Sequence, residues 1–314
     1  MSIRYSIVVP VYNEELVLET CYSRLTAVME KTGEDYELIF VDDGSRDKTA
    51  AMVSCLCEKD SHVRMLSFSR NFGHQTAITA GMDAAAGQAV VVIDADLQDP
   101  PEVILDMIKK WQEGYDVVYG RRLLRKGETV FKKLTAKVFY RLLRSMTSIE
   151  IPVDTGDFRL IDRKVCDVMC SLSEKNRYVR GLVSWVGFRQ TEVAYERDER
   201  LAGETKYPLK KMLKFAIDGI TTFSYKPLKL ATFLGVLSEL AGFFCLLLLL
   251  YSALFAHGAA WAMLIVLSAV FVMNGAVLLM LGVMGEYIGR IYDEAKDRPL
   301  YVIREKKGFN HEKS

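Results

Sequence analysis

The stretch Ala89-Val90-Val91-Val92-Ile93-Asp94-Ala95-Asp96-Leu97-Gln98-Asp99 passes from an apolar run straight into three acids. A short, valine-rich apolar run predicts a buried strand in a sheet that is covered on both faces. Open α/β sheets bind ligands just outside the carboxyl ends of their strands, which is where Asp94 and Asp96 fall. Two carboxylates one residue apart, with no Lys or Arg beside them in sequence, suit Mg²⁺ or Mn²⁺, and such an ion would hold a diphosphate.

The same acids have a second interpretation, in which they only cap the following helix. Asp99 favours it, because Asp99-Pro100-Pro101-Glu102 places an N-cap, a proline at the first helical position and an acid at N3. Asp94 and Asp96 lie too far upstream to cap that helix. The residues by themselves therefore favour a helix cap at Asp99. They leave Asp94 and Asp96 open between a metal site and an ordinary loop, because Asp-x-Asp is a common pattern.

The first part of the chain alternates between strand-like and helix-like segments. The expected strands are 5–11, 36–41, 63–68, 89–93 and 116–119, and the expected helices are about 14–32, 47–59, 74–86 and 100–113. Strands that alternate with helices through short connections predict one α/β domain, with a parallel sheet and helices on both of its faces.

Two further loops follow expected strands at the same edge. In Asp42-Asp43-Gly44-Ser45, an acid would accept hydrogen bonds from a nucleobase N–H or a ribose hydroxyl, or the loop is a turn with Ser45 or Asp47 as the helix cap. Tyr12 would stack on a base, while Glu14 and the acid after it favour a helix N-terminus. The sequence leaves both readings of the Asp42 loop open, and both can hold at once.

Charge and composition exclude some function classes. The 314 residues carry a net charge of +1 and no basic patch with interleaved aromatic residues, so nucleic acid is not an expected partner. The six cysteines form no CxxC pair and none has zinc-like spacing to a histidine.

The C-terminal part predicts a transmembrane hairpin. The apolar stretches 230–255 and 260–284 are each long enough to cross a bilayer as a helix, and only a short loop separates them. The flanks are basic, at Lys226, Lys229, Arg290, Lys296 and Arg298, whereas the loop has no Lys or Arg. By the positive-inside rule both termini are cytoplasmic.

Two features accompany the hairpin. Residues 208–220 have apolar residues on one helical face and lysines on the other, which predicts a helix in the cytoplasmic membrane interface; an ordinary solvated helix is the alternative. Glu239 lies within the first span, where an acid is costly, and it either has a function there or faces a partner helix or another subunit.

Five motifs in order resemble those of family 2 glycosyltransferases and, more narrowly, of the polyprenyl-phosphate glycosyltransferases. These are Pro10-Val11-Tyr12-Asn13-Glu14, Val41-Asp42-Asp43-Gly44-Ser45, Asp94-Ala95-Asp96-Leu97-Gln98-Asp99-Pro100-Pro101, Asp154-Thr155-Gly156-Asp157-Phe158-Arg159 and Arg200-Leu201-Ala202-Gly203-Glu204-Thr205-Lys206-Tyr207. The resemblance spans almost the whole chain, including the two spans and Gly285-Glu286-Tyr287-Ile288-Gly289-Arg290.

The resemblance implies a GT-A, Rossmann-like fold, and inverting transfer of a hexose from a UDP-sugar to undecaprenyl phosphate in the bacterial inner membrane. Glucose is the first expectation for the sugar and N-acetylglucosamine the second. The implied metal ligands are Asp94, Asp96 and Gln98, the implied nucleoside pocket is Pro10, Tyr12, Glu14 and Asp42, and the implied phosphate-binding residues are Arg122, Arg200 and Lys206. Such a metal stabilises the departing diphosphate as a Lewis acid, and arginine suits a phosphate because its planar fork can bind two oxygens.

The resemblance also makes Asp157 a candidate catalytic base; the other candidate catalytic residues are Asp96, through the metal, and Arg122, through a phosphate. Base catalysis has to be weighed against the acceptor, since a phosphomonoester is largely dianionic at pH 7 and has little need of deprotonation. The alternatives to a base are that Asp157 orients an arginine, or the acceptor through it, and that it simply shapes a turn. His74 is expected to be a structural or sugar-edge residue. These roles stay open on the sequence alone.

The expected organisation is a GT-A domain over 1–205, amphipathic juxtamembrane helices over 206–228, two transmembrane helices over 229–285 and a cytoplasmic tail over 286–314. A homo-oligomer is expected, because glycines in the spans allow close packing against neighbours. One rival is a processive polysaccharide synthase, which would have more spans and a Gln-x-x-Arg-Trp motif. The other is a non-catalytic scaffold for a lipid-sugar flippase, which degenerate acids at 94 and 96 would have favoured.

Overall fold

The computed structural model describes residues 3–123, 155–198, 226–255 and 259–309. These residues fall into two compact units. An α/β unit contains the described residues up to 198 together with 299–309, and a helical unit contains residues 226–255 and 259–298.

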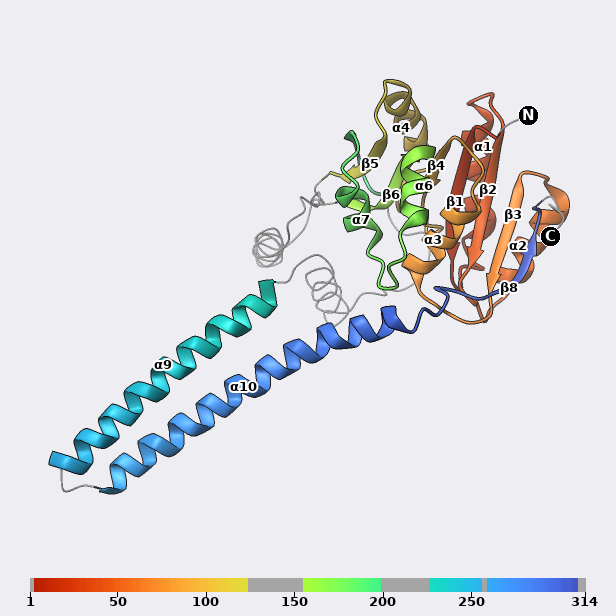
Figure 1. Ribbon diagram of the computed structural model, residues 1–314. Helices are drawn as coiled ribbons and strands as arrows, with labels where there is room; N and C mark the ends of the chain where they lie inside the picture. Colours follow the sequence, from red (N-terminus) through yellow and green to blue (C-terminus); the bar gives the residue numbers. More distant parts are fainter. Residues whose placement is uncertain (1–2, 124–154, 199–225, 256–258, 310–314) are drawn as a thin grey trace. The chain divides into compact units, whose positions relative to one another are not determined.

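The α/β unit is built on one sheet with the strand order β7-β5-β6-β4-β1-β2-β3-β8 (Figure 1). The strands are β1 (Tyr5–Val11), β2 (Tyr36–Asp42), β3 (Val63–Phe68), β4 (Ala89–Val92), β5 (Val117–Arg122), β6 (Thr155–Asp162), β7 (Gln190–Tyr195) and β8 (Ile303–Lys307). Strands β4, β1, β2 and β3 run parallel, whereas β6 is antiparallel to β4 and β5, and β8 is antiparallel to β3. The predicted α/β class and its five strands are confirmed; β6, β7 and β8 are additional.

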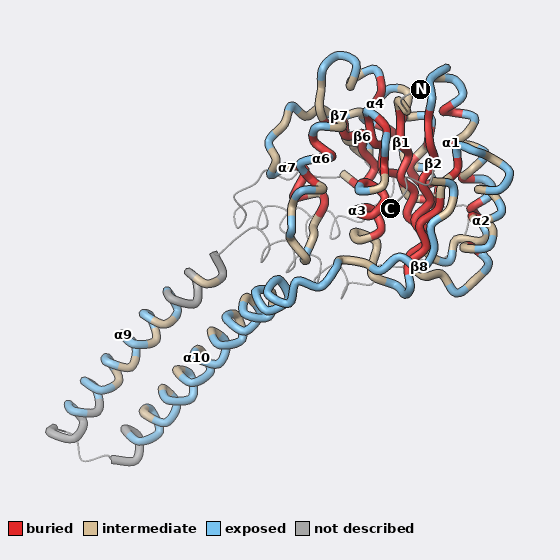
Figure 2. Tube along the Cα trace, turned by 45° about the vertical axis from the view of Figure 1, so that its right-hand side comes forward, coloured by how far each residue is buried: buried red, intermediate tan, exposed pale blue. Residues whose placement is uncertain are grey.

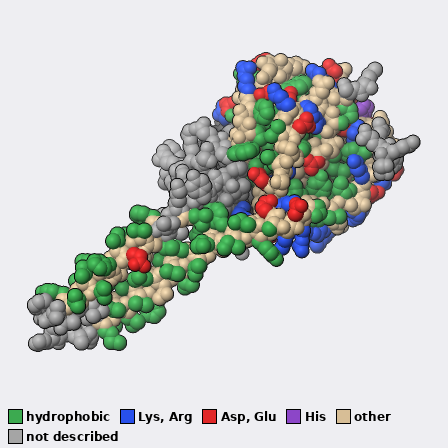
Figure 3. All heavy atoms as spheres, in the orientation of Figure 1, with side chains coloured by type: hydrophobic (Ala, Val, Ile, Leu, Met, Phe, Trp, Pro, Cys, Tyr) green, Lys and Arg blue, Asp and Glu red, His purple; other side chains and the backbone are tan. Residues whose placement is uncertain are grey.

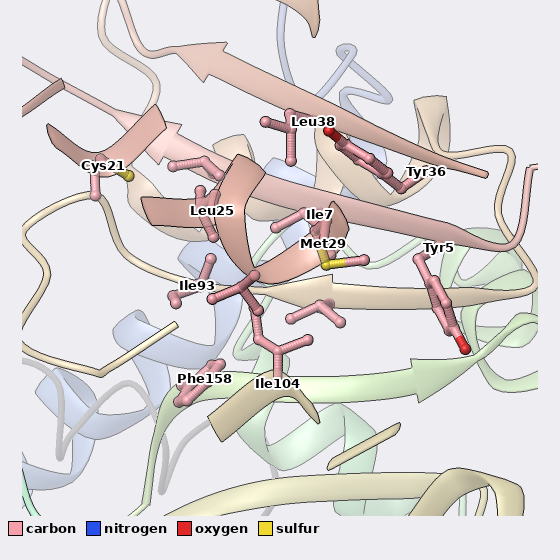
Figure 4. Close-up of a cluster of buried hydrophobic side chains, with 14 of the residues drawn as sticks. Tyr5, Ile7, Cys21, Leu25, Met29, Tyr36, Leu38, Ile93, Ile104 and Phe158 are labelled. Atoms are coloured by element: carbon pink, nitrogen blue, oxygen red, sulfur yellow. The ribbon is translucent and has the colours of Figure 1, made fainter. Parts of the chain in front are cut away.

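Helices cover both faces of this sheet. They are α1 (Leu18–Glu30), α2 (Thr49–Lys59), α3 (His74–Ala84), α4 (Val103–Gln112), α6 (Arg163–Ser171) and α7 (Val179–Trp185). Leu25 and Met29 of α1 and Ile104 of α4 pack with Ile7 of β1 in one apolar cluster (Figure 4). The central strands β1, β2 and β4 are buried along their length while the outer helix faces are exposed, as expected for a sheet covered on both sides (Figure 2).

Helix α3 packs closely against the face of the sheet opposite to the one that α1 and α4 cover. A Cβ atom added to Gly81 would overlap Val8 of β1 and come within 3.2 Å of Val41 of β2. Glycine at this position therefore lets the helix backbone approach the two central strands.

Replacing Gly81 by valine is expected to lower the free energy of unfolding by about 2 kcal/mol, because the added side chain overpacks the interface between α3 and the sheet. The matched control is Ala51→Val, which adds apolar volume at an exposed position of α2. Thermal or denaturant unfolding of the purified variants measures the difference. Equal midpoints for the two variants would mean that the interface tolerates the extra volume.

The segment expected to be a cytoplasmic tail, 286–314, contains a strand that the sequence does not predict, while its cytoplasmic location stays a prediction. Residues Ile303–Lys307 form β8, which pairs antiparallel with β3 at the edge of the sheet. The charged sequence of β8, Ile-Arg-Glu-Lys-Lys, lacks the apolar run that identifies a buried strand, because an edge strand is exposed. The described residues 299–309 are thus part of the α/β unit.

The helical unit contains two long helices, α9 (Lys226–Phe255) and α10 (Ala259–Ala295). They are antiparallel: the backbone at Gly235 approaches Met280, and that at Gly242 approaches Met273. Hydrophobic side chains cover much of the face of both helices that Figure 3 shows. A Cβ atom added to Gly275, Gly282 or Gly285 would meet no described atom within 4 Å, so two of the five span glycines pack inside the hairpin and three do not.

Among the described residues, one helix is long and apolar enough to cross a membrane, namely Met263–Ala295 within α10. Helix α9 contains a shorter apolar segment, Phe233–Leu248. The second span and the orientation of the hairpin stay predictions. The predicted interface helix over 208–220 lies outside the described residues, and Glu239 is exposed on α9.

Candidate active site

The loop after β4 carries the two acids that the sequence analysis assigns to a metal. Leu97 has a positive φ of 56°, an uncommon conformation for a non-glycine residue that often accompanies functional loops. This turn lets one carboxylate oxygen of Asp96 accept a hydrogen bond from the backbone N–H of Gln98 at 3.2 Å. Asp94, Asp96 and Gln98 therefore share one tight loop at the carboxyl end of β4.

The Asp94 carboxylate fits a divalent cation. Its side chain is 31% exposed, and its buried Oδ1 atom accepts no hydrogen bond within the described residues. Burial raises the pKa of Asp94 to about 6, although the nearby His74 acts in the opposite direction. A partly buried carboxylate is stabilised by positive charge, which His74 supplies here and which a bound metal cation would add.

The rest of the ligand set is sparse. The described residues contain no cluster of three or more His, Cys, Asp or Glu side chains of metal-binding geometry. A cation here would rely on Asp94, Asp96, the amide oxygen of Gln98 and oxygens of the substrate. That composition is typical of Mg²⁺ sites, which use one or two carboxylates together with substrate phosphates and water.

His74, the first residue of α3, joins Asp94 to Asp157 of β6. Its Nε2 atom lies 3.4 Å from Asp94 Oδ1 and 3.3 Å from Asp157 Oδ2. Burial would lower the pKa of His74, but the two carboxylates outweigh burial and raise that pKa to about 9. The imidazolium therefore neutralises part of the acidic charge between the two strands.

Asp157 is buried and is held by Arg180 of α7. Arg180 donates from Nε to Oδ1 at 2.8 Å and from Nη2 to Oδ2 at 3.0 Å, which is a two-bond pairing. Gln75 adds a bond from its Nε2 to Oδ2 at 3.3 Å and accepts from the N–H of Val179 at the start of α7. Burial would raise the pKa of Asp157, but Arg180 and His74 hold it well below its usual range.

This geometry bears on the role of Asp157. A carboxylate with a depressed pKa, already accepting bonds from an arginine and a glutamine, is a weak proton acceptor. The arrangement matches the second of the expected roles, in which Asp157 orients an arginine.

The prediction that Asp99 caps the following helix is wrong. Helix α4 begins at Val103 and no side chain caps it, whereas Asp99 is buried and accepts from Arg122 Nη2 at 2.9 Å and from the Tyr195 hydroxyl at 2.6 Å. Arg197 Nε lies 3.5 Å from the same carboxylate. A buried carboxylate requires a counter-charge, and that requirement outweighs the local capping pattern.

Arg122 is the last residue of β5, and its Nε and Nη2 atoms donate hydrogen bonds to Asp99. The predicted phosphate contact of Arg122 would use the remainder of a guanidinium that is 27% exposed. The Asp99 carboxylate raises the pKa of Arg122 against the effect of burial, so this residue keeps its charge.

The loops after β1 and β2 are bonded to each other. The Asn13 N–H donates to Ser45 Oγ at 3.0 Å, and Asn13 Oδ1 accepts from the Arg46 N–H at 2.8 Å. Tyr12 and Glu14 are partly exposed in the first of these loops, and Pro10 is buried within β1. These two loops form the surface on which the sequence analysis places a nucleoside.

Asp42 differs from the expectation of a direct ligand. Its side chain is 0% exposed, and its two oxygens accept from the Ser45 N–H at 2.9 Å and from the Ser67 hydroxyl at 2.8 Å. Its bonds are therefore made inside the fold, where they hold the loop after β2 in place.

Asp43 and Arg180 are site residues to which the sequence analysis assigned no role. Asp43 accepts from the N–H groups of Phe72 and Gly73, just ahead of α3, and so holds the end of the helix that carries His74. Asp43 belongs to the motif Val41-Asp42-Asp43-Gly44-Ser45, so the sequence did mark it as a possible site residue. Arg180 belongs to none of the five motifs, and only the fold brings it to Asp157. Arg200 and Lys206 lie outside the described residues.

Comparison with known proteins shows the family to which the chain belongs. The family model described as glycosyl transferase family 2 matches residues 6–169. A Bacillus subtilis (strain 168) relative, named uncharacterized glycosyltransferase YkcC, is 63% identical and covers 99% of this chain and 96% of its own. The prophage bactoprenol glucosyl transferase homolog of Escherichia coli (strain K12) is 38% identical over 96% of this chain and 98% of its own.

A solved structure gives a more distant similarity. Glucosyl-3-phosphoglycerate synthase from Mycobacterium tuberculosis, in complex with Mn²⁺, UDP-glucose and phosphoglyceric acid, is 20% identical, with a TM-score of 0.45 over 70% of this chain and 78% of that chain. The motifs, the GT-A-like sheet and the full-length relatives agree: the chain belongs to glycosyl transferase family 2 and resembles bactoprenol glucosyl transferases along nearly its whole length.

Proposed function

We propose that this glycosyltransferase moves a hexose from a UDP-sugar to undecaprenyl phosphate, with inversion at the anomeric carbon. Glucose is the first candidate for the sugar and N-acetylglucosamine the second. The observation that carries the proposal is the contact between the Asp94 loop and the Asp157–Arg180 pair through His74. It brings an acidic, cation-binding edge next to a cationic group, which suits a reaction between a diphosphate donor and a phosphate acceptor.

The chemistry is a single displacement. An oxygen of the acceptor phosphate forms a bond to the anomeric carbon while the bond from that carbon to the diphosphate breaks, and UDP departs with the electron pair. Bound at Asp94, Asp96 and Gln98, Mg²⁺ or Mn²⁺ would stabilise the negative charge that develops on the leaving diphosphate. The loops that carry Tyr12 and Glu14 would hold the nucleoside.

In this proposal Asp157 is a positioning residue and not a base. The acceptor phosphomonoester is largely dianionic at neutral pH, so no proton need be removed before it attacks. Asp157 fixes the guanidinium of Arg180 by two bonds, and Arg180 places positive charge beside the reacting phosphates. Arg122, Arg200 and Lys206 are proposed as further phosphate contacts.

The acceptor is a membrane lipid, and the helical unit supports that choice. We propose that α9 and α10 both cross the bacterial inner membrane, with the α/β unit and both termini in the cytoplasm, because basic residues flank the hairpin and its loop has none. A homo-oligomer is part of the proposal, and Gly275, Gly282 and Gly285 are small residues that do not pack inside the hairpin.

Two other functions compete with this one. A processive polysaccharide synthase would add many sugars to one acceptor, and a non-catalytic scaffold for a flippase would transfer none. The acids of the Asp94 loop are intact, which argues against the scaffold.

Transfer of radiolabelled sugar to undecaprenyl phosphate tests the proposal. The purified full-length chain is incubated with Mg²⁺ and a panel of UDP-, GDP- and dTDP-sugars, and the lipid fraction is separated. We expect one labelled lipid, carrying one sugar, from a UDP-hexose. A polymeric product would favour the synthase, and no transfer from any donor despite nucleotide binding would contradict the enzyme.

A further inference from the structure

The C-terminal strand β8 is bonded to the α/β unit at several points. It pairs with β3 from Met65↔Lys307 to Phe68↔Ile303, and the Val302 carbonyl accepts from the Ser69 N–H at 2.9 Å. Just before the strand, Tyr301 stacks on Phe68 with ring centroids 5.1 Å apart. The Tyr301 hydroxyl also donates to Asp83 of α3 at 3.0 Å. These contacts define where the side chains of β8 lie.

Arg304 of β8 lies beside the ends of β2 and β3. Its Nη2 atom donates to the Ser67 hydroxyl at 2.9 Å and lies 3.8 Å from Asp42 Oδ2. Ser67 in turn donates to the same Asp42 oxygen at 2.8 Å. Asp42 is fully buried, and a buried carboxylate is stabilised by a counter-charge, which the guanidinium of Arg304 supplies.

The bonds continue from Asp42 to the loops of the proposed nucleoside site. The other Asp42 oxygen accepts from the Ser45 N–H, and Ser45 Oγ accepts from the Asn13 N–H. A continuous path thus connects Arg304, through Ser67, Asp42 and Ser45, to the loop that carries Tyr12 and Glu14. Each step is a hydrogen bond of 2.8–3.0 Å between described atoms.

We propose that Arg304 is a positioning residue of the donor site, which acts by holding Asp42 and, through it, the two nucleoside loops. The inference rests on the proposed function, because it assumes that a nucleotide binds these loops. Half of the Arg304 side chain is exposed, so water screens part of its attraction to Asp42. The two hydrogen bonds through the Ser67 hydroxyl therefore account for much of the coupling between Arg304 and Asp42. The strand that follows the membrane helices in sequence therefore helps to form the donor site.

The proposed role of Arg304, behind the nucleoside loops, predicts an effect on KM for the donor rather than on kcat. Nucleoside contacts are the same in the ground state and the transition state, so weakening them raises KM for the donor and leaves kcat nearly unchanged. An effect on the acceptor side would change the KM for the lipid instead.

The test measures UDP affinity and donor kinetics of the full-length protein in nanodiscs, with Mg²⁺ present. Arg304→Ala is expected to raise the Kd for UDP and the KM for the donor about ten-fold, whereas Arg304→Lys retains affinity within about three-fold. Lys306→Ala is the matched control: it removes a cation from the same strand, at a residue whose contact is with the Phe309 ring.

A double-mutant cycle shows whether Arg304 acts through Ser67. The variant that combines Arg304→Ala with Ser67→Ala should bind UDP about as weakly as the weaker of the two single variants, because coupled residues are not additive. If Arg304→Ala does not fold, as judged by its melting temperature, Arg304→Gln replaces it in the cycle.

The outcomes separate the two proposals. A wild-type protein that binds no nucleotide would overturn the proposed function. Wild-type binding of UDP with an unchanged Kd in Arg304→Ala, an equal loss in Lys306→Ala, or fully additive losses in the cycle would each overturn the role of Arg304.

Discussion

Replacing Asp96 by asparagine is expected to lower the rate of metal-dependent sugar transfer about 10³-fold while leaving the fold intact. The substitution removes a negative charge from the proposed cation site but preserves the size of the side chain and an oxygen that can accept from the Gln98 N–H. Asp94→Asn should have an effect of the same order, since Asp94 has the buried oxygen without a hydrogen-bond donor in the described residues.

Two measurements check this expectation. Titration with Mn²⁺ in the presence of UDP reports cation binding without any turnover, and label transfer reports the rate. Asp106→Asn, at an exposed position of α4 where the carboxylate pairs on the surface with Lys109, is the matched control and should behave as the wild type. Near-normal rate and cation affinity in Asp96→Asn would show that the metal assignment is wrong.

Asp157→Asn and Arg180→Gln are each expected to slow transfer about 10²-fold, and the double variant should be no slower than the poorer single one. The physical reason is that the two side chains form one unit, in which the carboxylate fixes the guanidinium by two bonds. Loss of either side chain removes the two-bond pairing from a largely buried charge, so both single variants should also melt at lower temperature.

The pH profile distinguishes positioning from base catalysis. Because the pKa of Asp157 is held well below its usual range, the carboxylate stays ionised throughout the assay range, and its stabilising effect is lost only on strong acidification. A loss in Asp157→Asn that is equal at all pH values between about 6 and 9 supports positioning, whereas full rescue at high pH would assign the loss to ionisation of the acceptor. Asp167→Asn, in an exposed pair with Arg163 on α6, provides the control.

The sequence predicts those parts of the fold that depend on residues close together in the chain. The apolar runs of β1 to β4 have the length and composition of buried strands, and each ends in polar residues, so both the strands and the edge that carries Asp94 and Asp96 can be read directly. The long apolar stretches of α9 and α10 are equally local. The order of five motifs then identifies the family, and full-length relatives confirm it.

The parts that the sequence does not predict depend on contacts between distant residues. Asp99 looks like a helix cap because its neighbours Pro100 and Glu102 fit one, but Arg122 and Tyr195 bond to it in the folded chain. Asp157 looks like a base until Arg180 and His74 are placed around it. In both cases a buried carboxylate takes charged or polar partners that only the folded sheet brings within reach.

Strand β8 shows the same division. Its charged sequence carries no strand signal, yet it pairs with β3 and places Arg304 on Ser67, which is 237 residues away in the chain. By itself the sequence determined the α/β class, the acidic edge and the apolar helices, because those features follow from composition and periodicity over short segments. The resemblance of five ordered motifs indicated the family. Only the tertiary structure decided which charges pair with which, because pairing depends on distances between strands that the sequence does not encode locally.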